Sequence, residues 1–415
     1  MQDARLYPRY RFVMGTLDIL CSSLTHMVCL AIAPMLNFIA ADLGVDAATA
    51  GYATTLLILM QGVFMLCGPM IVSMLDHKKT QLAGVSVMVV GSVLSYFSPG
   101  FGMLLAARFL TGVGHGLSSA CTHSIIAAWF PPKEKSAMVT ANRLGIVAIT
   151  TLTYTCTVPV YRALGSSWRL VLLLMGGVLL VLDIAWALFA RNNDALNAYI
   201  REQNAQTGKK VNAFSSMREA LSRKDVMQLG VFMGLTTIAA NGISTYLPQF
   251  LENVRCYTAV EASAIVGVAS GVSALATLAG GVATTAIGKR KAIIVPFYTL
   301  SIVFLTLSLL VGQAALISAL FILYTVCSNL YAPASQTIST ELRDVTPALT
   351  SSSASISFGI GFIGTFFTSP LLKFSTQAFG EEYSMLVYVP LFIIALIFSM
   401  LLPETGPGRK AANAK

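Results

Sequence analysis

The chain has 415 residues, of which 55% are hydrophobic and only 11% are charged. Because soluble domains carry roughly twice that charged fraction, the composition excludes a soluble globular protein and predicts an all-α membrane protein. The net charge of +9 would favour a nucleic-acid partner in a soluble chain, but here the basic residues gather in alternate loops between apolar segments. We therefore expect a lipid bilayer around the chain and no nucleic acid.

Apolar segments of spanning length recur along the whole sequence. The first follows a basic N-terminus without a convincing small-residue cleavage site, so we interpret it as a retained helix rather than a signal peptide. About twelve spans are predicted. They lie at residues 12–40, 49–75, 81–97, 102–130, 137–161, 168–190, 226–251, 260–286, 292–311, 314–339, 348–372 and 383–402.

A polar, basic segment divides the predicted spans into two halves. We expect an N-terminal six-helix bundle at residues 1–190, a cytoplasmic linker at 191–225, and a C-terminal six-helix bundle at 226–415 with a short cytoplasmic tail. Most of the 27 Lys and Arg residues fall in one alternate set of loops and in the termini. By the positive-inside rule, both termini are predicted to be cytoplasmic, in a multi-pass protein of the cytoplasmic (inner) membrane.

The fourth predicted span, within residues 104–135, is unusually polar. It carries Arg108 and two histidines, which are costly in hydrocarbon unless they face a polar interior. Gly112, Gly114 and Gly116 occupy more than one face of this helix and would let a neighbouring backbone approach closely. We expect the other helices to surround this one and to form a path for a solute.

The two halves match each other at nearly constant spacing. His115 and His123 of the fourth predicted span correspond to Asn329 and Gln336 of the tenth. Two homologous halves with a binding site at their interface are typical of secondary transporters.

Three motifs resemble those of the major facilitator superfamily, and the resemblance covers essentially the whole chain. The loop after the second span keeps the acid and the bases of the family's G-x-x-x-D-[RK]-x-G-[RK]-[RK] motif but lacks both glycines. Its second-half copy has threonine in the acid's place, and the fourth span matches R-x-x-x-G-x-G. The matching residues are Asp76, Lys78 and Lys79; Gly281, Gly288, Lys289 and Arg290; and Arg108, Gly112 and Gly114.

The resemblance implies two pseudo-symmetric six-helix bundles that rock around a central cavity. It also implies that the two loop motifs form a conformational latch, in which Asp76 accepts hydrogen bonds from basic groups and helix N-termini. Drug exporters of the family usually carry G-x-x-x-G-P-x-x-G-G in helix five, of which only Pro159 is present here. This departure argues against drug antiport.

Charged side chains within the spans are nearly all in the N-terminal half. Asp18 and His26 lie near one face of the first span, and Arg143 enters the fifth span at a depth similar to that of Asp18. The resemblance makes these helices neighbours, so we expect an Asp18–Arg143 ion pair. The pair could only hold two helices together, or it could be exchanged for a substrate anion or a proton during the cycle.

Arg108 and the histidines of the fourth span each have a structural and a functional interpretation. Arg108 is common across the family whatever the substrate, which favours a structural role. His115 and His123 share a face, and a histidine that titrates near neutrality is a natural proton carrier. Buried neutral histidines bonded to a neighbour are at least as frequent, and the sequence leaves these alternatives open.

Neutral polar side chains complete the candidate site. The resemblance implies that helices one, four, seven and ten line the cavity, which adds Asn241, Tyr246, Asn329, Tyr331 and Gln336 to the site. A site that is ionisable on one wall and carries amides and phenols on the other favours a small polar organic metabolite, with an anion among the options.

We therefore predict a secondary active transporter that works by alternating access as a proton-coupled symporter, with a proton-coupled drug or metabolite efflux antiporter as the alternative. A membrane enzyme would need a nucleophile with its base, or metal ligands at a spacing such as HExxH. Neither is present, and the seven cysteines lack CxxC spacing, so we predict no enzyme activity, no metal and no cofactor. The predicted partners are the solute, protons and lipid, and the chain is predicted to be a monomer.

Overall fold

The structure is a computed structural model of the chain, and it describes residues 7–194, 218–219, 221–341, 356 and 358–405. Within these residues the secondary structure is helical, with no strand. Nine helices in this part of the chain are long and apolar enough to cross a membrane by length and composition. The prediction of an all-α membrane protein is confirmed.

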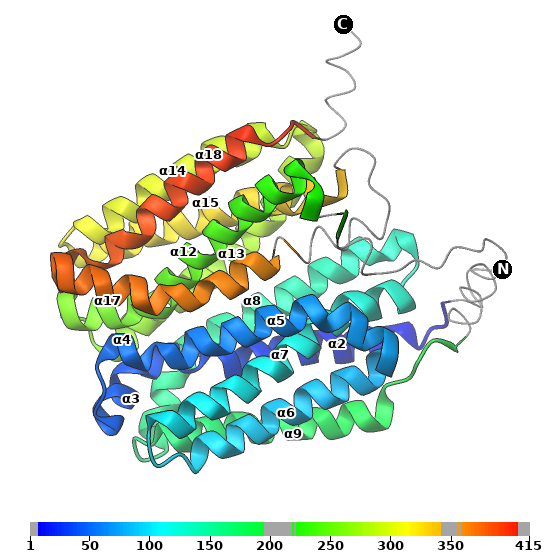
Figure 1. Cartoon of the computed structure of the whole chain (residues 1–415), viewed down its shortest axis with the longest axis horizontal. Helices are drawn as coiled ribbons and strands as arrows, with labels where there is room; N and C mark the ends of the chain where they lie inside the picture. The colour runs from blue at the N-terminus through cyan, green and yellow to red at the C-terminus, as the bar shows by residue number, and fades with distance from the viewer. Residues whose placement is uncertain (1–6, 195–217, 220, 342–355, 357, 406–415) are drawn as a thin grey trace, which may run out of the picture.

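The helices of the first half pack against one another (Figure 1). In chain order they are α2 (Arg11–Leu30), η1 (Ala33–Met35), α3 (Leu36–Leu43), α4 (Ala47–Ala50), α5 (Tyr52–Leu75), α6 (His77–Tyr96), α7 (Phe101–Trp129), α8 (Pro132–Ala163) and α9 (Trp168–Phe189). α7 packs on both α5 and α6, and α2 packs on α7, α8 and α9. The polar fourth span is thus surrounded by other helices, as expected.

The helices of the second half form a second group, the upper one in Figure 1. They are α12 (Lys224–Arg255), α13 (Ala259–Ile287), α14 (Lys291–Leu310), α15 (Ala314–Glu341), η2 (Thr365–Phe367), α17 (Thr368–Phe379), η3 (Glu381–Tyr388) and α18 (Val389–Leu401). The two groups meet where α8 packs on α13, α5 on η2 and α12 on η1. Most of the predicted linker at residues 191–225 lies outside the described residues.

Two predicted spans are less regular than the sequence pattern indicates. The first, expected as one helix over 12–40, is interrupted at η1, because Pro34 removes a backbone donor and disfavours an unbroken α-helix. The last, expected over 383–402, begins with the 3-10 helix η3 and becomes α-helical at Val389, next to a proline. The span expected at 348–372 is described only from residue 358 onward, apart from Ile356, and ends at Phe379.

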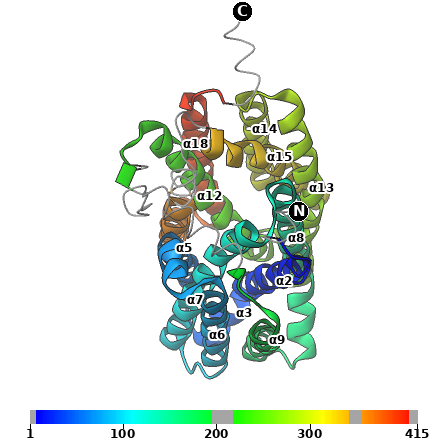
Figure 2. The same cartoon turned by 90° about the vertical axis from the view of Figure 1, so that its right-hand side faces the viewer.

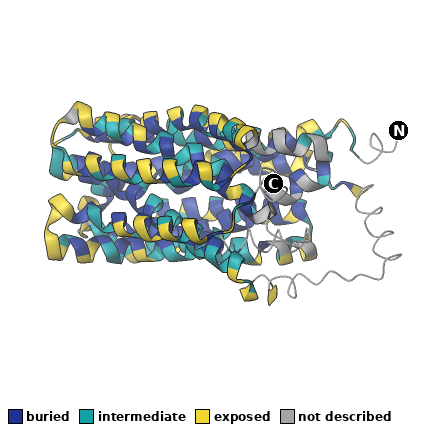
Figure 3. Cartoon of the chain, turned by 90° about the horizontal axis from the view of Figure 1, so that it is seen from above, coloured by how far each residue is buried: buried dark blue, intermediate teal, exposed yellow. Residues whose placement is uncertain are grey.

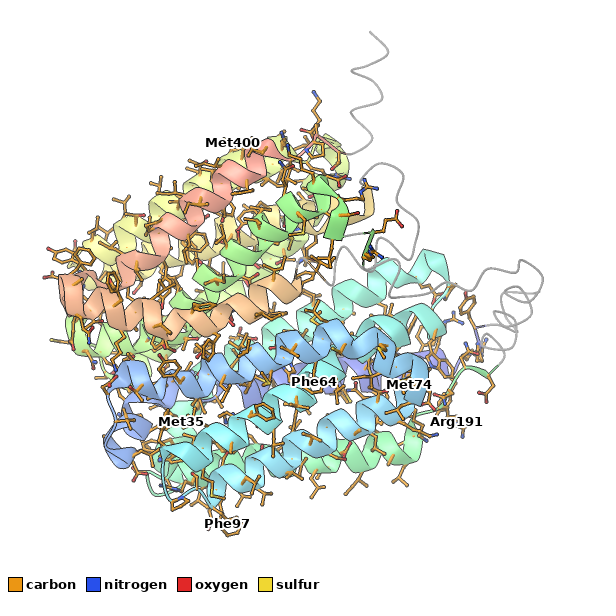
Figure 4. All side chains as sticks on the ribbon, viewed as in Figure 1. Met35, Phe64, Met74, Phe97, Arg191 and Met400 are labelled. Carbon is orange, nitrogen blue, oxygen red and sulfur yellow. The ribbon has the colours of Figure 1, made fainter. Side chains whose placement is uncertain are left out.

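The two ends of the molecule are identified by labelled residues in Figure 4. Phe97 lies at one end, and Met74, Arg191 and Met400 lie at the other. We name these the Asn37 end, after a residue that joins the two halves there, and the Arg191 end. The start of α2 and the end of α18 are both at the Arg191 end, where the two groups of helices spread apart (Figures 1 and 2).

The outer faces of the helices are apolar and exposed, as a chain surrounded by lipid requires. Figure 3 shows exposed residues along these outer faces. Leu152, Val181, Leu275 and Val282 are each more than half exposed. Their exposure identifies the lipid-facing side of each helix, which makes polar residues on the opposite sides easier to interpret.

Close backbone contacts explain the glycines of α7. A Cβ at Gly112 would collide with the carbonyl of Leu57 on α5, and one at Gly114 would collide with the carbonyl of Gly84 on α6. These two glycines therefore let α7 fit between its neighbours, as predicted from the sequence.

Replacing Gly112 by alanine should lower the melting temperature of the purified protein. The added methyl group meets backbone rather than a movable side chain, so we expect a loss of about 1–3 kcal/mol of stability. Gly102→Ala on the same helix is the matched control, because a Cβ there meets nothing within 4 Å. It should be neutral or slightly stabilising, and equal melting temperatures for the two variants would contradict the packing described.

Candidate functional site

A cluster of buried polar side chains joins α2, α7 and α8 in the interior of the first half. Ser22 of α2 lies at its centre, with its Oγ 2.8 Å from Oγ1 of Thr122 on α7. Asn142 of α8 donates from Nδ2 to the same Ser22 Oγ at 2.9 Å. Asp18 and His26 lie one turn before and after Ser22 on α2, so all three occupy one face of the helix.

The structure does not form the expected ion pair between Asp18 and Arg143. Asp18 is fully buried; its Oδ2 accepts from Asn142 Nδ2 at 3.5 Å, and its Oδ1 has no partner among the described residues. Asn142 and Arg143 are consecutive in α8 and so point about 100° apart. Asn142 is the one that faces α2, and the predicted pair is wrong for this structure.

Asp18 is suited to hold a proton. Burial of a carboxylate without a cation is costly, and a neutral acid avoids that cost. Its neighbours Asn142, Ser22 and Thr122 are neutral hydrogen-bonding groups. This position therefore accepts a protonated acid much more readily than an ionised one.

His26 and His115 form a pair across α2 and α7. Nδ1 of His26 lies 2.7 Å from the carbonyl oxygen of Ser22, and a carbonyl only accepts, so this nitrogen carries a proton. Nε2 of His115 is 3.4 Å from the same Nδ1, and the rings meet edge to face with centroids 4.6 Å apart. His115 is therefore paired with His26 rather than with His123, whose side chain lies outside the described residues.

Arg143 lies on the face of α8 that is turned toward the second half. Tyr154, about three helical turns further on, marks this face because its hydroxyl donates to the carbonyl of Ser244 on α12 at 3.1 Å. Ala148 and Leu152 lie on roughly the opposite face and are exposed, as lipid-facing residues are. Arg143 is also exposed, which requires a water-accessible space between the two halves at this level.

Arg143 combines exposure with proximity to the histidine pair. Asn142, the residue before it in α8, hydrogen-bonds Ser22, which lies one helical turn before His26 on α2. No acid among the described residues forms an ion pair with it. The site thus presents an unpaired guanidinium beside an imidazole.

Arg108 points away from this space. It is fully buried and donates to the carbonyl of Val28 at 3.3 Å and to Oγ of Ser95 at 3.2 Å. Both partners lie toward the Asn37 end, on α2 and α6. These contacts hold three helices together, so the geometry favours the structural interpretation of Arg108.

The amide residues predicted for the opposite wall lie on α12 and α15. Asn241 is half-buried and donates to the carbonyl of Thr237 on its own helix at 2.9 Å. Asn329 accepts from the hydroxyl of Thr277 on α13 at 3.3 Å. Gln336, about two turns further along α15, lies on nearly the same face as Asn329 and is exposed.

The two tyrosines predicted for the site have packing partners instead. Tyr331 is buried against Tyr298, with ring centroids 4.9 Å apart. The hydroxyl of Tyr246 lies 2.6 Å from Oγ of Ser369, and its ring packs on Gly51. Tyr246 therefore belongs to the contact between the halves at the Asn37 end.

Asn37 is the centre of that contact. Its Nδ2 donates to the Glu252 carboxylate at 2.7 Å and to Oδ1 of Asn253 at 3.3 Å, while its Oδ1 accepts from Nε2 of Gln249 at 3.0 Å. A salt bridge of 3.6 Å between Lys373 and Asp46 joins the halves nearby. Asn37 was not predicted from the sequence, because a single amide at a helix end does not by itself indicate a contact between the two halves.

Asp46 lies between two spans and is held ionised by its neighbours. Partial burial acts to raise its pKa, but hydrogen bonds from Thr49 and the charge of Lys373 outweigh burial and keep the pKa below its usual value. Ionised Asp46 therefore stabilises the folded protein above the pKa that this carboxyl has in the unfolded chain. This stabilisation is lost as the pH falls through the lower pKa of Asp46 in the folded protein. Because Lys373 and Asp46 are about half exposed, water screens the pair and its contribution is at most about 1 kcal/mol.

Replacing Asn37 by alanine should loosen the Asn37 end. The buried Gln249 amide would lose its acceptor, which costs about 1–3 kcal/mol and shifts the protein toward states that are open there. Spin labels at the exposed residues Phe97 and Phe379, with exposed native cysteines replaced by serine, would report longer distances by pulsed EPR.

Lys373→Ala at the same end is the matched control for Asn37→Ala. It removes only the half-exposed ion pair, so the distance distribution should change little. If both variants gave the distribution of the parent protein, the Asn37 contact would not hold this end closed.

A cavity of about 270 Å³ also lies at the Asn37 end. Its lining includes Asp46, Tyr246, Gln249, Lys373 and Glu381, which come mostly from the second half. The histidine pair and Arg143 are not part of it. We therefore place the candidate functional site at Arg143 and the histidines.

The first loop motif has the geometry of a helix cap. Oδ1 of Asp76 accepts the backbone N–H of Lys79 at 3.0 Å, at the start of α6, and the Lys79 ammonium is 3.9 Å away. The carbonyl of Lys78 accepts from the indole of Trp186 on α9 at 3.1 Å. Asp76 has a φ of 67°, a conformation that favours glycine. Its role as a latch remains a prediction.

In the second loop motif the acid comes from the segment just after α18. Glu404 accepts the backbone N–H groups of Arg290 and Lys291 at 2.6 and 3.3 Å, at the start of α14. Arg290 donates from its buried guanidinium to the carbonyl of Thr284, and Gly288 has a φ of 66°. Lys289 is exposed, and a Cβ at Gly281 would meet no neighbour within 4 Å. Glu404 therefore occupies the position of the acid that the motif itself lacks.

Family models and known structures agree with this fold. Residues 19–351 match the family model described as the Major Facilitator Superfamily. The chain belongs to this superfamily. The fold class predicted from the sequence is confirmed, and membership in the Major Facilitator Superfamily makes the chain a multi-pass membrane transporter.

Three individual proteins illustrate the similarity. A bacterial homologue of the human lysosomal transporter Spinster, solved in an inward-facing and unoccupied conformation, has a TM-score of 0.75 at 15% identity, over 95% of this chain and 97% of that one. The uncharacterized transporter YycB of Bacillus subtilis (strain 168) is 22% identical over 54% of this chain and 52% of its own. A Drosophila ananassae protein whose name proposes inorganic phosphate cotransport is 38% identical over 14% of this chain and 13% of its own. The matched regions thus span about half or less of these curated relatives.

Proposed function

We propose that the chain is a secondary active transporter that moves a small polar, anionic organic metabolite by proton-coupled symport. The observation that carries this proposal is Arg143, an exposed guanidinium that is unpaired among the described residues. It follows Asn142, which hydrogen-bonds Ser22 one turn before His26 on α2. A guanidinium in this setting suits a carboxylate, which it binds through two parallel hydrogen bonds. None of the described acids pairs with Arg143, so we propose that the solute supplies the carboxylate.

A separate group is proposed to carry the proton. Asp18 lies in the same polar cluster as His26, through Ser22, but it is fully buried and lacks a cation. Protonation from one side of the membrane and release to the other would couple proton movement to solute movement. In this scheme Arg143 binds the solute and Asp18 holds the proton.

The proposed orientation places the Asn37 end outside and the Arg191 end in the cytoplasm. Basic residues of the loop motifs, among them Lys79 and Lys289, lie on the Arg191 side, which supports this assignment. With the halves joined at the Asn37 end, the structure would correspond to an inward-facing state. The division at 1–190 and 226–415, the monomeric state and the cytoplasmic membrane are part of the same proposal.

Uptake into proteoliposomes under an imposed pH gradient tests the proposal. A gradient that drives protons inward should drive a radiolabelled organic anion inward with them, and a protonophore should abolish the uptake. Movement of solute against the direction of protons would instead establish the efflux antiporter. If no organic anion responded to either gradient, the coupling would be refuted.

A further inference from the structure

The charge available to a solute in the site can be counted from the described residues. Arg143 is exposed toward the interior, whereas Arg108 is buried and engaged with Val28 and Ser95. Further arginine and lysine side chains, among them Arg162, Lys289 and Lys291, lie near helix ends in the described chain, and several others form ion pairs there. These pairs are Arg11–Glu134, Arg169–Asp42, Arg223–Asp225, Arg255–Glu382 and Lys373–Asp46.

The described residues that we place opposite Arg143 are neutral. Asn241 and Asn329 are neutral amides, and Gln336 is a third. With His26 and His115 neutral and Asp18 protonated, one positive charge faces the solute; if Asp18 were ionised, the net charge of the cluster would be zero. A solute with one negative charge matches this site, and a second negative charge would be buried without a partner.

His26 offers a second point of recognition. Its Nδ1 donates to the carbonyl of Ser22, so Nε2 of the neutral ring is an acceptor. This nitrogen has no hydrogen-bond partner among the described residues and is not fully buried. His115 supports the ring from the side and fixes its orientation. The lone pair on Nε2 can therefore accept a hydrogen bond from a hydroxyl or N–H group of the solute.

We propose that the transported solute is a small hydroxy-monocarboxylic acid. Its single carboxylate would bind Arg143, and a hydroxyl on the same molecule would donate to Nε2 of His26. This assignment rests on the proposed function and narrows its substrate from organic anions in general. Dicarboxylates and inorganic phosphate, which carry more than one negative charge near neutral pH, would be poor ligands.

Thermal unfolding of the purified full chain tests the charge and the hydroxyl separately, because a ligand of the folded state raises the melting temperature. The probes are glycerate and gluconate, with propionate lacking the hydroxyl, malate adding a carboxylate, and inorganic phosphate and glycerol as further comparisons. Glycerate or gluconate should bind at least about tenfold more tightly than propionate or malate. Arg143→Gln should lose this binding, and Arg143→Lys should retain part of it.

A second variant isolates the hydroxyl contact. His26→Phe keeps a ring of similar size but removes the acceptor, so the preference for glycerate over propionate should fall from about tenfold to near unity. The unfolding curve of each variant without ligand shows whether it is folded. Discrimination that survives in folded His26→Phe would overturn the assignment of the hydroxyl to His26.

The outcomes separate the two levels of the proposal. If malate or phosphate bound best, the monocarboxylate assignment would be overturned while anion transport stood. If only glycerol bound, the proposed anionic substrate would fail as well. If hydroxy-monocarboxylates bound equally well to folded Arg143→Gln, the site would lie elsewhere.

Discussion

Arg143→Gln should reduce uptake of the transported anion by at least about 100-fold, because two charge-assisted hydrogen bonds worth about 1.5–3 kcal/mol each would be lost. The protein should remain folded, since Arg143 is exposed and no described acid depends on it. Initial uptake rates in proteoliposomes with equal amounts of protein measure the effect.

Two control variants define what the loss of Arg143 means. Arg143→Lys retains the charge without the planar pair of donors, so uptake should fall by about tenfold rather than 100-fold. Arg162→Gln removes an exposed arginine near the end of the same helix and should leave uptake unchanged. Uptake by Arg143→Gln at the rate of the parent protein would mean that this arginine does not bind the substrate.

Asp18→Asn should abolish proton-driven accumulation while leaving solute exchange intact. Asparagine has the shape of a protonated aspartate and satisfies the same buried position without a titratable group. Accumulation under a pH gradient should therefore fall to the level of equilibration, whereas counterflow of labelled against unlabelled solute should stay within about twofold of the parent rate.

Asp183→Asn is the matched control for Asp18→Asn. Asp183 is also a buried acid in the first half, but it lies between α6 and α9, where it accepts from Ser86 at 2.6 Å. Accumulation by Asp183→Asn should resemble that of the parent protein. If Asp18→Asn still accumulated solute, another residue would carry the proton.

Much of the fold could be predicted from the sequence because a long run of apolar residues marks each membrane-spanning helix. The predicted spans 168–190 and 292–311 differ by one residue at most from the ends of α9 and α14. The interruption at Pro34 was not predicted, since the apolar pattern continues through it. The change from 3-10 to α-helix before Val389 was missed for the same reason.

The sequence indicated which residues belong to the candidate site better than it indicated which of them contact one another. The depth of a residue along its helix can be estimated from residue numbers, and this estimate placed Asp18 and Arg143 at a similar depth in the membrane. Rotation about the helix axis depends on the neighbouring helices, and a shift of one residue placed Asn142 rather than Arg143 beside Asp18. The one feature of the sequence that could have indicated this partner of Asp18 is that Asn142, next to Arg143, is also polar.

Contacts between distant parts of the chain account for the other differences. Tyr246 was predicted to line the site, but Ser369 and Gly51, far away in the sequence, bring it into the Asn37 end. His115 was grouped with His123 by spacing, whereas the packing of α2 on α7 pairs it with His26. Glu404, which lies just after α18, provides the acidic group at the second loop motif.

A structure of the protein with its transported solute bound would test the central claim most directly. We predict the solute between the two halves, with its carboxylate hydrogen-bonded to the Arg143 guanidinium and its body next to His26. A solute bound in the interior with neither Arg143 nor His26 in contact, or bound in the cavity at the Asn37 end, would contradict it.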